Sequence, residues 1–203
     1  MSLRIDSKPV VVGMSGASGS VLARATVELL LSRGVPVVST ASPAARVVWT
    51  EEMDESFGEA IERWAGMGDF THCAIGDMRA SIASGTFPTA GMAVVPCSMA
   101  TAAAIAHGHA DNLLRRAADV TIKEGRPLVV VPRETPLSVI HLRYLADLAA
   151  AGATIIPPEP AFYLRQQTTE EVVDFVAHRT AVALGVLEDL PERMRYAGPT
   201  FSH

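Results

Sequence analysis

Short runs of β-branched and other apolar residues alternate along this chain with stretches that have helical spacing. The runs lie at residues 9–13, 35–40, 92–95, 128–131 and 153–156. Unbroken apolar runs of this kind are typical of strands that are buried on both faces. A repeated strand–helix–strand order predicts an α/β domain, in which helices cover a parallel sheet.

Capping and turn residues divide the intervening stretches into expected helices. Residues 54–84 carry few signals and receive no assignment. Because the chain has 203 residues without repeats or a linker, we predict a single domain over 1–203, with a core over about 9–184 and a C-terminal tail over about 185–203. The expected helices run from about Ser18 to Gly34, over 43–53, over 98–107, from an Asp111 N-cap to Gly125, from Pro136 onward, and over 168–184 behind a Thr168–Glu171 capping box.

Composition excludes several classes of protein. Hydrophobic residues make up 49% and charged residues 19%, which predicts a packed core rather than disorder. The net charge of -5 argues against a nucleic-acid partner. No apolar run approaches the ~20 residues of a membrane span, and Met1–Lys8 lacks the apolar centre of a signal peptide. With only two cysteines, Cys73 and Cys97, we expect a cytoplasmic protein without disulfides or a membrane partner.

A glycine-rich segment, Gly13–Gly19, lies between the first predicted strand and the first predicted helix. Glycines let the backbone approach a ligand closely, and a helix N-terminus offers free N–H groups to an anion. Ser15 and Ser18 add hydroxyl donors. The segment lacks a Walker lysine and the G-x-G-x-x-G spacing. Taken alone, it fits a phosphate-binding turn and a tight packing turn equally well.

The stretch 115–143 is cationic within an acidic protein, because it has six basic residues and three acidic ones. Such a stretch suggests a small anionic ligand, although a solvated helix face explains the same count. Arg116 and Lys123 are about two helical turns apart and so project from one face. Asp119 lies between them, which also fits a surface ion-pair ladder.

Three other features bear on chemistry. Arg133 and Glu134 follow the carboxyl end of a predicted strand, where open α/β sheets bind ligands. His107 and His109 lack further ligands at a suitable spacing, so we expect no metal. Cys97 has no evident histidine partner, and we therefore expect no nucleophilic role for it.

Taken together, these motifs resemble those of the UbiX-type flavin prenyltransferases. The resemblance implies a Rossmann-like three-layer sandwich with a mostly parallel sheet flanked by helices, bound FMN and assembly as a homododecamer. The matching segments follow the family's order from about Val10 to Leu184: Gly13–Gly19, Ser84–Phe87, Gly91-Met92, Pro96–Ser98, Arg116–Val120, Lys123-Glu124, Arg133–Leu137 and Pro160–Tyr163.

The resemblance also implies roles for individual residues, partly contributed by adjacent subunits. The FMN-binding residues would be Gly16, Ala17, Ser18, Ser42, Ser98, Met99, Ala100, Thr101 and Arg133. The residues around the phosphate of the prenyl donor would be Arg116, Lys123, Tyr163 and Arg179. The catalytic residues would be Ser18, Lys123, Glu134 and an acidic residue about ten positions after Ser42, for which Glu52 fits the spacing better than Glu51.

The implied reaction joins a dimethylallyl group, taken from dimethylallyl phosphate, to N5 and C6 of reduced FMN without a metal. The prenylated FMN would pass to a UbiD-type decarboxylase. Two alternatives stay open: an FMN-dependent cysteine-type decarboxylase of the related flavoprotein family, and a non-catalytic flavin carrier. The related decarboxylases use a histidine after the second strand, whereas Arg46–Glu52 contains none. The residues do not decide between a monophosphate and a diphosphate donor.

Two positions depart from the family pattern. Ala100 stands where many relatives have lysine. The tryptophan that often follows the last helix is absent, and Met194 and Tyr196 lie in that region. Residues 54–76 have no clear counterpart in the family.

Overall fold

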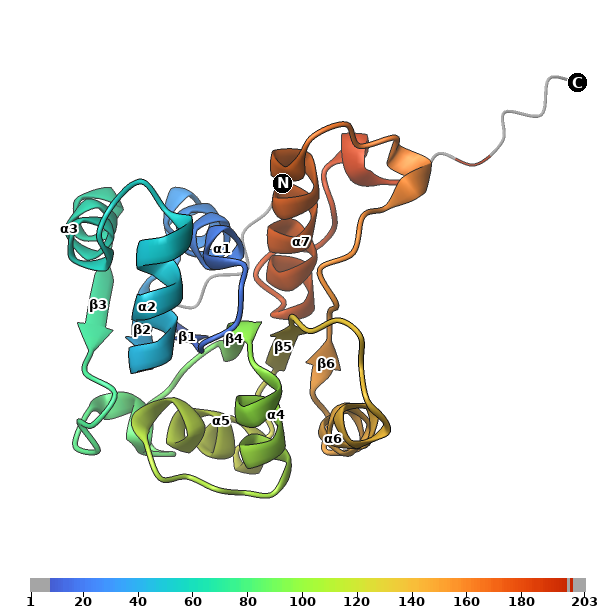
Figure 1. Cartoon of the computed structure of the whole chain (residues 1–203). Helices are drawn as coiled ribbons and strands as arrows, with labels where there is room; N and C mark the ends of the chain where they lie inside the picture. The colour runs from blue at the N-terminus through green and yellow to red at the C-terminus, as the bar shows by residue number, and fades with distance from the viewer. Residues whose placement is uncertain (1–7, 197, 199–203) are drawn as a thin grey trace, which may run out of the picture.

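The fold is a single six-stranded sheet between two layers of helices (Figure 1). The computed structural model describes residues 8–196 and 198, so the predicted tail over 185–203 lies partly outside the described residues. Every strand pairing is parallel, in the order β3-β2-β1-β4-β5-β6. This confirms the predicted Rossmann-like three-layer sandwich. The strands are β1 (Val10–Met14), β2 (Val37–Ala41), β3 (Phe70–Cys73), β4 (Gly91–Cys97), β5 (Leu128–Pro132) and β6 (Thr154–Ile155).

The helices divide between the two faces of the sheet. Helices α1, α2, α3 and α7 pack on one face, and α4, α5 and α6 pack on the other (Figure 1). Within residues 8–196 and 198, no helix has both the length and the apolar character that a bilayer span requires. The helices are α1 (Ser20–Ser32), α2 (Pro43–Glu52), α3 (Phe57–Met67), α4 (Met99–Ala106), α5 (Leu113–Lys123), α6 (Val139–Ala150) and α7 (Thr169–Ala183), with 3-10 turns η1 (Ser81–Ala83), η2 (Phe162–Leu164) and η3 (Glu192–Met194).

The core has two halves because successive side chains of a strand point to opposite faces. In β5, Val129 and Val131 join the half beneath α1 and α7, whereas Leu128 and Val130 join the half beneath α4 and α5. All four side chains are at most 2% exposed. A strand that is buried on both faces has no polar positions, which is why its sequence is an unbroken apolar run.

The stretch without an assigned structure, 54–84, contains helix α3, strand β3 and turn η1. Phe57 and Trp64 of this stretch both pack edge to face on Trp49 of α2, and Trp64 also packs on Phe70 of β3. The ring centroids of these pairs are 5.3–5.5 Å apart. This stack fixes α3 and the edge strand β3 to the core. Strand β3 has four residues and is only half-buried, so its sequence carried little strand signal.

One predicted helix start is wrong by a single residue. Helix α5 is capped by Asn112 rather than Asp111, because the Asn112 side chain accepts a hydrogen bond from the Arg115 N–H at 3.1 Å. The Asp111 carboxylate instead pairs with the Arg115 guanidinium at 2.7 Å. Both side chains suit an N-cap, so composition alone could not separate them.

Two boundaries that involve proline also differ from the prediction. Helix α6 begins at Val139 and not at Pro136, because Ser138 and His141 form a reciprocal capping box. Strand β4 continues through Pro96 to Cys97 instead of ending at the proline. Its pairing with β5 is interrupted at Val95 and Pro96, and Cys97 is again paired with Pro132.

Candidate active site

The carboxyl ends of β1 and β4 lie side by side at the centre of the sheet. The helix after β1 packs on one face, and the helix after β4 packs on the other. Chains that leave neighbouring strands for opposite faces open a crevice at the carboxyl edge, which is where doubly wound sheets bind ligands. The glycine-rich segment and the first turn of α4 lie at this edge.

Ser15 joins the two loops of this crevice. Its side chain is 1% exposed. The Ser15 hydroxyl donates to the Pro96 carbonyl at 3.1 Å and accepts from the Ser98 N–H at 2.7 Å. The prediction that Ser15 offers a hydroxyl donor to a ligand is therefore wrong, because its only proton is already donated to Pro96. Ser15 fixes the shape of the crevice instead.

Gly16 brings the glycine-rich segment into contact with α2. A Cβ atom at Gly16 would lie 2.4 Å from the Ala44 Cβ. Only glycine allows this approach, and the first turn of α2 thereby meets the loop. Ala17 follows with 6% of its surface exposed, so the loop turns its backbone rather than large side chains to the crevice.

Glu52 caps the N-terminus of α1 from the end of α2. Its carboxylate accepts from the Gly19 N–H at 2.9 Å and from the Ser20 N–H at 2.7 Å. Helix α1 therefore begins at Ser20, two residues after the predicted start, with Gly19 in a left-handed conformation at φ 115°. Partial burial raises the pKa of Glu52. Hydrogen bonds from the Ser18 hydroxyl and from the backbone of Ser20 and Gly19 lower it by more, so the pKa lies below its usual value. The carboxylate is thus ionised at neutral pH and orients the Ser18 hydroxyl.

Arg133 lies at the end of β5, where its backbone N–H donates to the Cys97 carbonyl at 3.1 Å. Its side chain lines a cavity of about 360 Å³ together with Ser18 and Glu52. The Arg133 Nε is buried, and within residues 8–196 and 198 it has no hydrogen-bond partner. A buried guanidinium nitrogen without an acceptor is costly unless a ligand supplies one. The residues present therefore fit an anionic group such as the phosphate of FMN.

Ser42 and Ser98 are the N-caps of α2 and α4. The Ser42 hydroxyl accepts from the Ala45 N–H at 3.1 Å. The Ser98 hydroxyl accepts from the Thr101 N–H at 3.3 Å and donates to the Thr101 hydroxyl at 3.1 Å. The N-termini of α1, α2 and α4 thus all lie at the carboxyl edge, and each adds positive potential to it.

The first turn of α4 offers mainly its backbone to the crevice. Met99 is 6% exposed and packs in the core beneath α4. Ala100 is exposed, and Thr101 is buried with its hydroxyl bonded to Ser98. An FMN-binding role for these residues stays a prediction and would rest on their N–H groups.

Glu134 lies next to Arg133 and lines a neighbouring cavity of about 300 Å³, which shares Arg133 and Pro158 with the first. Its carboxylate accepts from the Thr135 N–H at 3.1 Å. In the described part of the chain, no ion pair joins Glu134 to Arg133, so Glu134 is not a tether for that guanidinium. Its exposed carboxylate remains available to a ligand in this second cavity.

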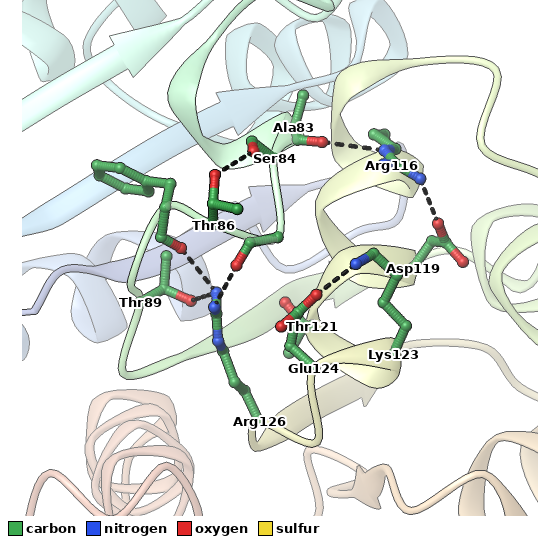
Figure 2. Close-up of polar contacts among 12 residues, drawn as sticks. Ala83, Ser84, Thr86, Thr89, Arg116, Asp119, Thr121, Lys123, Glu124 and Arg126 are labelled. Carbon is green, nitrogen blue, oxygen red and sulfur yellow. Dashed lines mark hydrogen bonds and ion pairs between the residues drawn. The ribbon is translucent and has the colours of Figure 1, made fainter.

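Arg116 and Lys123 form a second, separate cluster (Figure 2). The Arg116 Nε donates to the Ala83 carbonyl at 3.0 Å, and its Nη1 pairs with Asp119 at 2.7 Å. The Lys123 ammonium pairs with Glu124. The side chains of Arg116 and Lys123 both reach the segment before β4, as the two-turn spacing predicts. Lys123, at the end of α5, lies at the amino edge of the sheet, opposite the glycine-rich loop. Arg116 is in the first turn of α5, which begins at the carboxyl side, where the Leu113 N–H donates to the Ile75 carbonyl beyond β3.

Tyr163 and Arg179 lie apart from both clusters. Tyr163 of η2 is 53% exposed and packs edge-on against Tyr196, with ring centroids 5.5 Å apart. An aromatic ring thus occupies the region in which a tryptophan is expected. Arg179 is exposed on α7, about 15 Å along the helix axis from Thr169 at the cavity wall. Within a single chain, the four residues predicted to bind the donor phosphate, Arg116, Lys123, Tyr163 and Arg179, therefore do not lie together.

Sequence reasoning missed part of the cavity wall. Pro158, Val172 and Val173 line it beside Arg133. The capping box at Thr168 was the available signal, because it starts α7 at the cavity and turns the apolar side of its first turns inward. Among the described residues, no group of three or more His, Cys, Asp or Glu side chains is arranged to hold a metal ion.

A doubly wound parallel sheet with helix N-termini at its carboxyl edge, and with an arginine at the end of β5 whose Nε has no partner among the described residues, defines a class, the nucleotide-binding α/β proteins. Within this class, the Flavoprotein family model matches residues 2–181. The flavin prenyltransferase UbiX of Synechocystis sp. is 46% identical over 190 residues, which cover 89% of this chain and 92% of the relative. The chain therefore belongs to the UbiX family of flavin prenyltransferases.

Two solved structures are similar over most of their length. The crystal structure of AnUbiX (PadA1) in complex with FMN and dimethylallyl pyrophosphate has a TM-score of 0.82 at 39% identity, covering 88% of this chain and 92% of that one. A dodecameric FMN-dependent UbiX-like decarboxylase from Escherichia coli O157:H7 has a TM-score of 0.84 at 39% identity, covering 94% and 100%.

Proposed function

We propose that this enzyme transfers a dimethylallyl group from dimethylallyl monophosphate to N5 and C6 of reduced FMN, and that the prenylated FMN serves a UbiD-type decarboxylase. The observation that carries the proposal is the cavity at the carboxyl edge, where the buried Arg133 Nε has no acceptor in the part of the chain that the structure describes. The similar AnUbiX structure, which contains FMN and dimethylallyl pyrophosphate, supports the choice of ligands.

The carboxyl edge would hold FMN. Arg133 and the backbone N–H groups at the starts of α1, α2 and α4 would bind its phosphate. Reduced FMN supplies the nucleophilic ring atoms, and the allylic donor supplies the carbon that they attack. Ser18, oriented by the ionised Glu52, would position the reacting ring at the mouth of the cavity.

The donor phosphate would be bound by Arg116, Lys123, Tyr163 and Arg179. Fixed cationic donors stabilise a leaving phosphate without reorganising as the C–O bond breaks. Because Lys123 lies at the opposite edge of the sheet from Arg133, and Arg116 lines neither cavity that Arg133 borders, we propose that neighbouring copies in a homododecamer complete each site. Glu134, next to Arg133, would move a proton between the flavin and the departing phosphate.

The close contact at Gly16 leads to a prediction about FMN binding. Gly16→Ala places a Cβ 2.4 Å from the Ala44 Cβ, so the start of α2 must move away from the loop. We expect FMN affinity to fall about tenfold and stability to fall by about 1–3 kcal/mol. Fluorescence titration with FMN and thermal unfolding measure both. Gly66→Ala is the matched control, because an added Cβ there meets no atom within 4 Å; equal effects at Gly16 and Gly66 would contradict the role of the close contact.

The start of α6 leads to a prediction about assembly. Val139, Ile140 and Leu142 are 64%, 56% and 52% exposed, and a contact with another copy would bury them. We expect Ile140→Asp to reduce the oligomer to smaller species, because each buried isoleucine contributes about 1.5–3 kcal/mol to association. Light scattering measures the mass, with Ile140→Leu as the control that keeps it. An Ile140→Asp protein of unchanged mass would place the interface elsewhere.

The direct test supplies the protein with reduced FMN and either dimethylallyl monophosphate or diphosphate, and measures the mass of the flavin product. The proposal predicts a dimethylallyl adduct from the monophosphate. A flavin carrier would bind FMN without forming product, and a cysteine-type decarboxylase would instead release CO₂ from a C-terminal cysteine peptide.

A further inference from the structure

Arg126 follows the end of α5 in a defined turn. Gly125 adopts a left-handed conformation at φ 65°. The Gly125 N–H then donates to the Ile122 carbonyl at 3.0 Å, and the Arg126 N–H donates to the Thr121 carbonyl at 3.0 Å. This pair of bonds is the Schellman motif, which glycine at this position favours. It fixes the direction in which the Arg126 side chain leaves the helix.

Both terminal nitrogens of the Arg126 guanidinium bind the segment before β4 (Figure 2). Its Nη2 donates to the Gly85 carbonyl at 2.7 Å. Its Nη1 donates to the Phe87 carbonyl at 2.9 Å and to the Thr89 hydroxyl at 3.1 Å. Two backbone carbonyls and a buried hydroxyl are thus bound by one side chain. Such charge-assisted bonds hold a loop more firmly than bonds between neutral groups.

The segment that Arg126 holds is also the segment on which Arg116 and Lys123 rest. Arg116 donates to the Ala83 carbonyl at 3.0 Å. At Gly85, an added Cβ would lie 2.6 Å from the Lys123 Nζ and 2.2 Å from the Glu124 Oε1. The backbone at 83–85 therefore binds Arg116 directly and lies against the Lys123 ammonium.

We propose that Arg126 is a positioning residue for the prenyl-phosphate donor. It fixes the backbone at 83–89, and that backbone fixes Arg116 and Lys123 in the arrangement that binds the donor phosphate. Arg126 acts through the loop and not by touching the donor, since its guanidinium faces the Gly85 and Phe87 carbonyls. The inference rests on the proposed function, in which Arg116 and Lys123 bind the donor.

The test is a graded series of variants. Thr89→Val removes one acceptor, Arg126→Lys keeps the charge with fewer directed donors, and Arg126→Ala removes every contact. We expect the KM for dimethylallyl monophosphate to rise in that order, by about ten- to a hundredfold for Arg126→Ala. FMN affinity and oligomer mass should stay unchanged. Arg115→Ala is the matched control, because Arg115 is on the same helix and pairs only with Asp111 among the described side chains.

The outcomes separate the inference from the proposed function. A wild-type protein that forms no prenylated flavin would overturn the proposed function, and the inference with it. An active wild type with an unchanged KM in Arg126→Ala would overturn the inference alone. Equal losses of FMN affinity and donor use in Arg126→Lys and Thr89→Val would also overturn it, because they would mark a general role in folding.

Discussion

Glu134→Gln is expected to slow product formation by about 10²–10⁴-fold in a single turnover, while the protein still assembles and binds FMN. Glutamine keeps the shape of the side chain and can still accept from the Thr135 N–H, which the native carboxylate does at 3.1 Å. It cannot take up or release a proton. Mixing pre-bound reduced FMN with donor and following product by rapid quench isolates the chemical step from flavin binding.

The control for this experiment is the FMN affinity of the same variant. The Glu134 carboxylate forms no ion pair with Arg133 in the part of the chain that the structure describes, so FMN binding should be unaffected. An unchanged single-turnover rate would rule out proton transfer by Glu134. A large loss of FMN affinity would instead assign it to flavin binding.

Lys123→Ala and Arg179→Ala are each expected to impair use of the prenyl phosphate by about ten- to a hundredfold, with FMN binding intact. The loss of one charge-assisted contact with a phosphate costs about 1.5–3 kcal/mol. Both residues lie away from the Arg133 cavity within one chain, so the flavin phosphate should not sense either change. Steady-state kinetics at saturating FMN, together with FMN titration, measure the two effects separately.

Glu124→Gln is an informative companion to Lys123→Ala. Glu124 pairs with the Lys123 ammonium, which holds the pKa of that carboxyl below its usual value. Neutralising Glu124 leaves the lysine charge in place, so donor use should survive far better than in Lys123→Ala. Parallel losses of flavin binding and turnover in Lys123→Ala would show that this lysine is structural.

Much of the fold followed from the sequence because its strands are buried. Strand β5 was predicted almost to the residue, since burial on both faces requires an unbroken apolar run. Strand β3 was missed because it is a four-residue edge strand that is half-exposed. The start of α5 was misplaced because Asp111 and Asn112 are adjacent and equally suited to capping.

The candidate site was less accessible to sequence reasoning, because its contacts join distant parts of the chain. The cap that Glu52 places on α1 connects residues 32 and 33 positions apart. Arg126 reaches carbonyls about 40 positions earlier. Helical spacing put Arg116 and Lys123 on one face of α5, yet it carried no information on where they would lie relative to the sheet. Only the folded chain shows that Arg116 and Lys123 lie apart from the Arg133 cavity.

The central proposal is that Lys123 and Arg133 of one active site come from different copies of the chain. Co-assembly of Arg133→Ala chains with Lys123→Ala chains tests it most directly. If the halves come from different copies, random mixing restores about a quarter of wild-type activity, the share of sites that combine two intact halves. If both halves come from one chain, the mixed oligomer, verified by native mass spectrometry, stays as inactive as its parents, and that result would contradict the account.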